Sequence, residues 1–257
     1  MVRRAHLVAI VCLSFCWFAS GDAGEVRVAV ASNFVRTLHE LARDFEATTK
    51  DRVLISSGST GKLHAQIANG APFEVFLAAD VDSPRRLEQD GHAVAESRFT
   101  YALGRLALWT NRPGTVDGTQ TLLTRGTFRH LALANPRTAP YGAAAIQVLR
   151  AMDLWEAVET RVVFGENVGQ TFSFVSTGNA EIGFVALAQV MALEDASRGS
   201  FWVVPAELHT PIEQQAVLLA AGRDNAAATR FVSYLRSPTA RSIIERSGYE
   251  VESPPAP

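Results

Sequence analysis

The sequence predicts an α/β fold, on three observations. The chain has 257 residues, a length that suits one or two domains and can bury a sizeable core. Apolar residues make up 47% and charged residues 19% of the chain, a composition typical of globular proteins rather than disordered ones. Short β-rich runs alternate with stretches of helical periodicity, which favours parallel sheets flanked by helices.

The N-terminal 23 residues have the pattern of a secretory signal peptide. Two arginines precede an apolar run at 7–18, and small and polar residues follow that run. The run is too short to cross a bilayer as a helix, so we expect residues 1–23 to be removed and the rest exported to the periplasm. The alternative is a lipoprotein with Cys16 as the lipidated residue, which the bulky Phe15 before it disfavours.

Charge and cysteine usage narrow the function further. Both cysteines, Cys12 and Cys16, lie in the N-terminal segment, so the exported part can have no disulfide, thiolate metal site or catalytic cysteine. The formal charge is −2, and it becomes −3 when residues 1–23, with two arginines and one aspartate, are removed. Neither a basic excess nor a basic stripe is visible, so we expect no nucleic-acid binding.

The first half of the exported chain is expected to contain three strand–helix pairs. Its predicted strands are 26–31, 52–55 and 74–78. A Ser/Gly loop at 56–61 is expected to follow the second strand. The predicted helices are 34–45, a helix through Leu63 and Ile67 that ends at Gly70, and one from its N-cap Ser83 to Gly91.

The second half continues the alternation. Its predicted strands are 105–110, 130–134, 181–185, 201–204 and 215–220. Its predicted helices are 142–152, 172–177, 225–236 and 238–246. No Gly/Ser linker divides the chain, so two domains would be joined by strands that cross between them.

Four loops, each after a strand and before a helix, are candidate anion sites. They are Ser32-Asn33, 58–61, 135–142 and 167–170. A helix N-terminus offers unpaired N–H groups and the positive end of a dipole, to which glycines and hydroxyls add access and donors. In open α/β sheets such loops gather where ligands bind. Taken singly, each loop could equally be a turn or a helix cap.

Motifs for catalysis are incomplete. Ser59 to Lys62 match S-x-x-K, a penicillin-recognising motif, but its S-D-N and K-T-G partners do not occur. The chain has no G-x-S-x-G, no G-x-G-x-x-G and no P-loop, and its histidines lack metal-binding spacing. Asp80 and Asp82 fit turn and capping roles better than a metal site. The sequence therefore predicts no catalytic residue and no cofactor.

Five stretches, taken together, carry a resemblance to a known family. They are 28–34, 56–63, 69–80, 135–142 and 178–186. From about residue 26 to 249, the chain resembles the periplasmic molybdate-binding proteins of ABC transporters. The resemblance implies a type II periplasmic binding protein fold, in which two mixed β-sheets flanked by helices form two lobes joined by two crossovers. It implies lobe one at 25–102 and 209–257, and lobe two at 103–208.

The resemblance also implies a site. A molybdate or tungstate ion would lie between the lobes, held by hydroxyls and main-chain N–H groups, so that molybdenum is present only within the oxyanion and has no protein ligand. The implied binding residues are Ser32, Asn33, Ser59 or Thr60, Tyr141 and Val168, the last two through their N–H groups. The matching positions favour Thr60 over Ser59. The implied partner is a membrane permease, and the protein is expected to be a monomer.

One departure from the family pattern concerns the stretch after Gly183. Many members have a tyrosine there whose hydroxyl binds the ligand, whereas residues 184–188 of this chain carry no hydroxyl. A subgroup with the same variant uses an asparagine in the first loop, which Asn33 fits.

The sequence leaves three alternatives to a molybdate-binding protein. One is a binding protein for sulfate or phosphate. Another is a serine hydrolase that uses Ser59. The last is the effector domain of a transcription regulator, which the signal peptide argues against.

Overall fold

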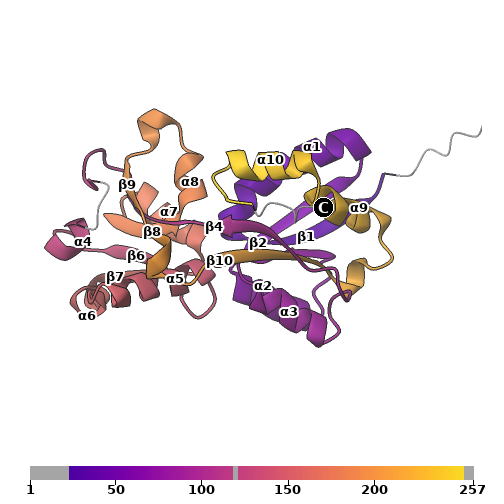
Figure 1. The fold of residues 1–257 in the computed structure, drawn as a ribbon, viewed down its shortest axis with the longest axis horizontal. Coiled ribbons are helices and arrows are strands. Elements are labelled where there is room, and N and C mark those ends of the chain that lie inside the picture. Colours follow the sequence, from indigo (N-terminus) through magenta and orange to yellow (C-terminus); the bar gives the residue numbers. More distant parts are fainter. Residues whose placement is uncertain (1–22, 118–120, 252–257) are drawn as a thin grey trace, which may run out of the picture.

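The computed structural model describes residues 23–117 and 121–251 and contains two five-stranded mixed sheets side by side, each flanked by helices (Figure 1). This confirms the expected α/β class with two mixed sheets. Both cysteines, and all but the last residue of the expected signal peptide at 1–23, lie in residues 1–22, outside the described part. Within the described part, no helix combines the length and apolar character needed to cross a membrane.

The first sheet, with its helices, is lobe one. Its strands, in spatial order, are β2 (Arg52–Gly58), β1 (Glu25–Ala31), β3 (Val75–Leu77), β10 (Ile212–Leu218) and β4 (Phe99–Gly104). β1 is parallel to both β2 and β3, whereas β10 runs antiparallel to β3 and β4. Its helices are α1 (Val35–Thr49), α2 (Thr60–Ala68), α3 (Asp82–Gln89), α9 (Ala226–Leu235) and α10 (Pro238–Arg246).

The second sheet, with its helices, is lobe two. Its strands, in spatial order, are β7 (Val162–Gly165), β6 (Leu131–Ala134), β8 (Ile182–Ala186), β5 (Leu106–Thr110) and β9 (Ser200–Val203). β6 is parallel to β7 and β8, and β5 is antiparallel to β8 and β9. Its helices are α4 (Thr121–Arg125), α5 (Pro140–Ala151), α6 (Trp155–Val158), α7 (Val168–Ser176) and α8 (Leu187–Met191).

The chain passes between the sheets twice. It leaves the first sheet between β4 and β5, at Arg105, and returns between β9 and β10, through 204–211. β4 and β10 are paired neighbours, so the two connections lie together in the middle of the molecule (Figure 1). The lobe boundaries implied by the resemblance fall within β4 and just before β10, and they stay a prediction.

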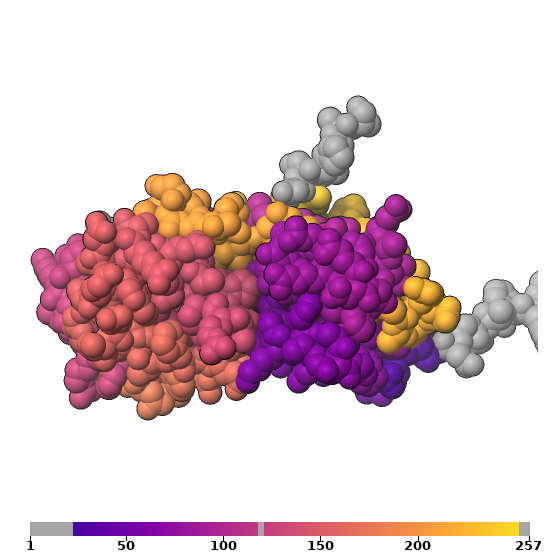
Figure 2. All heavy atoms as spheres, turned by 90° about the horizontal axis from the view of Figure 1, so that it is seen from below, coloured from indigo at the N-terminus to yellow at the C-terminus, as the bar shows by residue number. Residues whose placement is uncertain are grey.

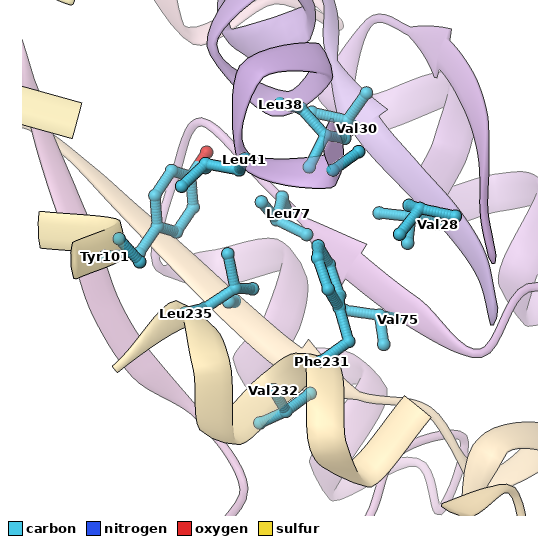
Figure 3. Packing of buried hydrophobic residues seen from close by; sticks show 14 of the residues in the cluster. Val28, Val30, Leu38, Leu41, Val75, Leu77, Tyr101, Phe231, Val232 and Leu235 are labelled. Carbon is cyan, nitrogen blue, oxygen red and sulfur yellow. The ribbon is translucent and has the colours of Figure 1, made fainter. Parts of the chain in front are cut away.

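The core of lobe one explains why α1 and α9 lie against the sheet. Leu38, Leu41 and Phe45 recur at helical spacing on α1 and are buried, and Phe231 and Leu235 of α9 are buried in the same cluster (Figure 3). Each such side chain stabilises the fold by about 1.5–3 kcal/mol when it leaves water. The apolar periodicity therefore determines which face of each helix packs inward.

The structure corrects several predicted elements. The expected loop at 56–58 belongs to β2, because β2 stays paired with β1 as far as Gly58. Ser83 is not the N-cap of α3, which begins at Asp82. Instead, Asp80 accepts hydrogen bonds from both the N–H and the hydroxyl of Ser83, a turn role that agrees with the prediction for Asp80.

Other elements were missed or placed too short. The strand β4 was not predicted, nor were β7 and the short helices α4, α6 and α8. α7 begins at Val168 rather than at 172, because the side chain of Asn167 accepts the N–H of Gln170 and caps the helix there.

Candidate oxyanion site

A small pocket of about 10 Å³ lies between the lobes. It is lined by Ala31, Ser32, Asn33, Thr60, Ala79, Ala139, Pro140, Tyr141, Asn167 and Val168. The structure thus brings five of the six predicted site residues together at one place. It leaves Ser59 out of the lining, and that these residues bind an anion stays a prediction.

Ser32 and Asn33 lie at the end of β1, in a 3-10 turn (Ser32–Phe34) that leads into α1. Neither side chain caps the helix, so the simple capping interpretation of this loop is wrong. The Ser32 hydroxyl oxygen accepts the N–H of Gly169, from lobe two, at 3.2 Å. Its own proton remains available to an anion in the pocket.

The Asn33 side chain forms its hydrogen bonds within the protein. Its Nδ2 group donates to Gln214 Oε1 at 2.8 Å and to Tyr249 Oη at 3.1 Å, and the residue is only 4% exposed. An amide nitrogen has two protons, so both are committed to these partners. The donor that Asn33 can offer to an anion is therefore its backbone N–H.

Thr60 is the first residue of α2, and Ser59 precedes it. The Thr60 Oγ1 atom accepts the N–H of Ala79 at 3.1 Å, and the residue is only 1% exposed. Its hydroxyl proton is thereby left for the pocket. Ser59 is the N-cap residue of α2, but its hydroxyl is buried without a hydrogen-bond partner among the described residues and makes no capping hydrogen bond.

Tyr141 and Val168 lie in the first turns of α5 and α7. The N–H groups of a first helical turn have no acceptor within the helix. Pro140 precedes Tyr141 and has no N–H of its own, so Tyr141 contributes the first free N–H group of α5. The starts of both helices line the pocket, which therefore faces the positive ends of two helix dipoles from lobe two.

The pocket is electrostatically positive without a cationic side chain. Among the described residues, no lysine, arginine, aspartate or glutamate lines it. Hydroxyls and the N-terminal ends of helices from both lobes surround it instead. Such a set of donors stabilises an anion that carries no proton, because it offers no carboxylate to accept one.

A buried polar network lies beside the pocket and joins the two lobes. Gln214 of β10 accepts from Asn33 and from the Tyr101 hydroxyl through Oε1, and its Nε2 donates to the Tyr141 hydroxyl at 3.4 Å. The Tyr249 hydroxyl donates to the carbonyl of Asn33 at 2.8 Å. Burial raises the pKa of all three tyrosines well above the usual range, so each remains neutral.

The sequence reasoning missed Gln214, Tyr101 and Tyr249. The signal that could have found Gln214 is the pair of glutamines at 214–215 directly before the apolar run 216–220, since a buried amide needs partners. The tyrosines carry no local signal, because their partners lie far away along the chain.

The two lobes are in contact beside the pocket, and Figure 2 shows them abutting. The Gly61 N–H donates to the Thr138 carbonyl oxygen at 2.9 Å. Lys62 of α2 forms an ion pair with Glu166, just before α7. Both contacts join lobe one to lobe two beside the helix ends that form the pocket.

Three glycines permit this close approach. A Cβ atom at Gly61 would lie 3.1 Å from Thr138 Cα, and one at Gly169 would lie 3.3 Å from Ser32 Cβ. A Cβ at Gly104 would lie 2.2 Å from the Tyr141 hydroxyl. A side chain at any of these positions would hold the lobes apart or displace Tyr141.

Comparison with known proteins places these features in context. Residues 26–250 match the family described as bacterial extracellular solute-binding proteins. The chain is 49% identical over 233 residues to the molybdate-binding protein ModA of Azotobacter vinelandii, covering 91% of this chain and 92% of that protein. It is 43% identical over 230 residues to ModA of Rhodobacter capsulatus, covering 90% of each.

Solved structures give the same picture. The periplasmic molybdate-binding protein of Azotobacter vinelandii superposes with a TM-score of 0.85 at 43% identity, over 89% of this chain and all of that one. The sulfate-binding protein SubI of Mycobacterium tuberculosis superposes with a TM-score of 0.72 at 14% identity, over 88% of this chain and 86% of that one. The second likeness concerns the fold alone.

Proposed function

Since this chain belongs to the family of bacterial extracellular solute-binding proteins, we propose that it captures molybdate in the periplasm and delivers it to the permease of an ABC transporter. The observation that carries the proposal is the interlobe pocket lined by Ser32, Asn33, Thr60, Tyr141 and Val168. There, Ser32 and Thr60 can offer hydroxyls, and the other three residues can offer N–H groups. The relatives named ModA support molybdate as the ion.

The chemistry of the pocket favours an unprotonated tetrahedral dianion. Molybdate and tungstate carry no proton near neutral pH, so hydrogen-bond donors can satisfy every oxygen. Phosphate retains a proton and would need an acceptor, which this pocket does not provide. Sulfate also lacks a proton, so it is rejected by size in a cage of backbone groups. Tungstate has the same charge and shape as molybdate, and we include it among the ligands.

Closure of the lobes completes the cage. Ser32, Asn33 and Thr60 come from lobe one, and Tyr141 and Val168 from lobe two, so an open form would offer only half of the donors. The ion therefore favours the closed form by contacts that exist only there. Because one chain supplies both halves, we expect a monomer to act, and its closed form to be the one that docks on the permease.

A serine hydrolase is the alternative from another class, and the geometry gives it no support. A nucleophilic serine needs a general base within hydrogen-bond reach. The Ser59 hydroxyl has no hydrogen-bond partner among the described residues. We assign the site to binding and no residue to catalysis.

Thermal melting of the chain lacking residues 1–23 tests the proposal. A ligand at about 1,000 times its dissociation constant stabilises by about 4 kcal/mol, which raises Tm by roughly 8–16 °C for a chain of this size. We expect that shift with molybdate and tungstate, and little with sulfate or phosphate. A shift with sulfate or phosphate alone would keep the fold and overturn the ligand, and no shift with any of the four would overturn the oxyanion function.

A further inference from the structure

Two grooves flank the pocket. The first, about 640 Å³, reaches the pocket at Ser32 and Asn33 and lies between α1 and α10 on one side and α7 and α8 on the other. We call it the α1 groove. The second, about 630 Å³, reaches the pocket at Ala79 and lies between α2, α3 and α5. An ion that enters the pocket as the lobes open passes the wall of one groove or the other.

The α1 groove has unpaired positive charge. Arg36, His39 and Arg43 lie three, four and seven positions apart on α1, so they share one face of the helix, and they line the groove. Arg246 also lines it but is paired with Glu40 at 3.5 Å. Within residues 23–117 and 121–251, neither Arg36 nor Arg43 forms an ion pair, and both are exposed.

The second groove has no such excess. Three acidic side chains, Asp80, Asp82 and Glu213, line it together with two arginines, Arg86 and Arg137. The chain as a whole is acidic, with a formal charge of −2. The α1 groove is therefore a locally positive surface on a chain whose net charge is negative.

We propose that the α1 groove is the electrostatic entrance to the site, where Arg36 and Arg43 attract the oxyanion and raise its rate of capture. The inference rests on the proposed function, since it concerns how the same ion arrives. Arg36 is three residues beyond Asn33, and Arg43 lies about 10 Å farther along the helix axis. That spacing is about one Debye length at 0.1 M salt. The attraction of an anion by Arg43 therefore extends to the region where Arg36 attracts it, next to the pocket.

The effect belongs to the association rate. Charged clefts raise the association rate of an oppositely charged ligand by about 10- to 1,000-fold, and salt removes the effect. Neither arginine lines the pocket, so neither contacts the bound ion. The dissociation rate is then independent of both residues.

The test compares two charge-matched double variants of the chain lacking residues 1–23. R36Q/R43Q removes the two groove charges. R150Q/R223Q removes two exposed arginines that line neither groove, at the end of α5 and after the 3-10 turn at Ala220–Gly222. Association and dissociation rates of molybdate are measured by stopped-flow tryptophan fluorescence, and the dissociation constant by calorimetry, at about 10 mM and about 500 mM salt.

We expect R36Q/R43Q to slow association about tenfold at low salt and less than about twofold at high salt, with an unchanged dissociation rate. R150Q/R223Q is expected to change association less than about twofold at either salt. If association slows equally in both variants, or slows in neither, the proposal that the α1 groove is the entrance is refuted. A faster dissociation in R36Q/R43Q would place the arginines in the binding contacts and also overturn it. Absence of molybdate binding by the unmodified protein would instead refute the proposed function.

Discussion

Replacement of Thr60 by valine separates the two tasks of one buried hydroxyl. Valine keeps the branched shape of threonine and removes only the polar group. In the structure, Thr60 Oγ1 accepts the N–H of Ala79 at 3.1 Å and leaves its own proton for the pocket. The T60V protein therefore loses one hydrogen bond to the ion and leaves the Ala79 N–H buried without its acceptor.

Both losses have a calculable size. A hydrogen bond to a charged group contributes about 1.5–3 kcal/mol, so molybdate should bind about 10- to 150-fold more weakly. An unsatisfied buried N–H group costs about 1–3 kcal/mol, so the Tm of the ligand-free protein should fall by about 2–12 °C.

Calorimetric titration with molybdate and thermal melting without it measure the two effects. T60S is the matched control, because it keeps the hydroxyl and loses only a methyl group, and it should bind nearly as tightly as the unmodified protein. S59A is a second control and should leave affinity unchanged, since Ser59 does not line the pocket. Affinity of T60V within about twofold of the unmodified protein would refute the assignment of this hydroxyl.

Three further predictions concern the surroundings of the site. Q214L should lower the free energy of unfolding by about 2–4 kcal/mol in urea titrations, because it leaves several buried groups unpaired. It should also weaken molybdate binding, because the Asn33 side chain loses one of its partners. Unchanged stability would contradict the role of the network. K62M should change the molybdate dissociation constant less than about fivefold, since its ion pair with Glu166 is half-exposed, and a larger change in calorimetry would show that closure depends on it. Although burial opposes the shift, hydrogen bonds from a backbone N–H and an arginine lower the pKa of Glu181 from 4.5 to about 2. The stabilisation that ionised Glu181 contributes is therefore present above pH 4.5 and is lost as the pH falls towards 2. Urea titrations across that range should show a smaller loss of unfolding free energy in E181Q.

The parts of the site that local sequence could predict are the ends of strands and the starts of helices. Ser32 and Thr60 each follow a predicted strand and open a helix or turn, a pattern that needs no distant information. Val168 opens α7 after β7, a strand that was not predicted. The same reasoning could not bring them to one pocket, because the closure of two lobes is a property of the whole chain. Here the family resemblance supplied what local pattern lacked.

The polar network could not be predicted from local sequence for the same reason. Asn33 is 181 residues from Gln214 and 216 residues from Tyr249. Sequence alone left open whether Asn33 would use its side chain or its backbone, and in the structure both side-chain protons are engaged by Gln214 and Tyr249. No periodicity reports a contact over such separations.

The α1 groove was missed although its residues lie close together in the sequence. Apolar and polar residues separate Arg36, His39 and Arg43, so a linear reading finds no basic stripe. The stripe appears only when the residues are placed on a helix, where they share a face. α7 was predicted to begin at 172 because the loop at 167–170 was expected to precede it, whereas Asn167 caps the helix.

The glycines between the lobes have a consequence for how the protein trades retention against release. A methyl group at Gly61, where a Cβ atom would lie 3.1 Å from Thr138 Cα, acts as a wedge between the lobes and shifts the population towards the open form. Apparent affinity is the intrinsic affinity scaled by the closed fraction. Such a wedge therefore weakens binding of the ion without changing any group that contacts it. Unloading at a membrane partner requires the same opening. The absence of a side chain at the interlobe glycines therefore affects both the retention of the ion and its release.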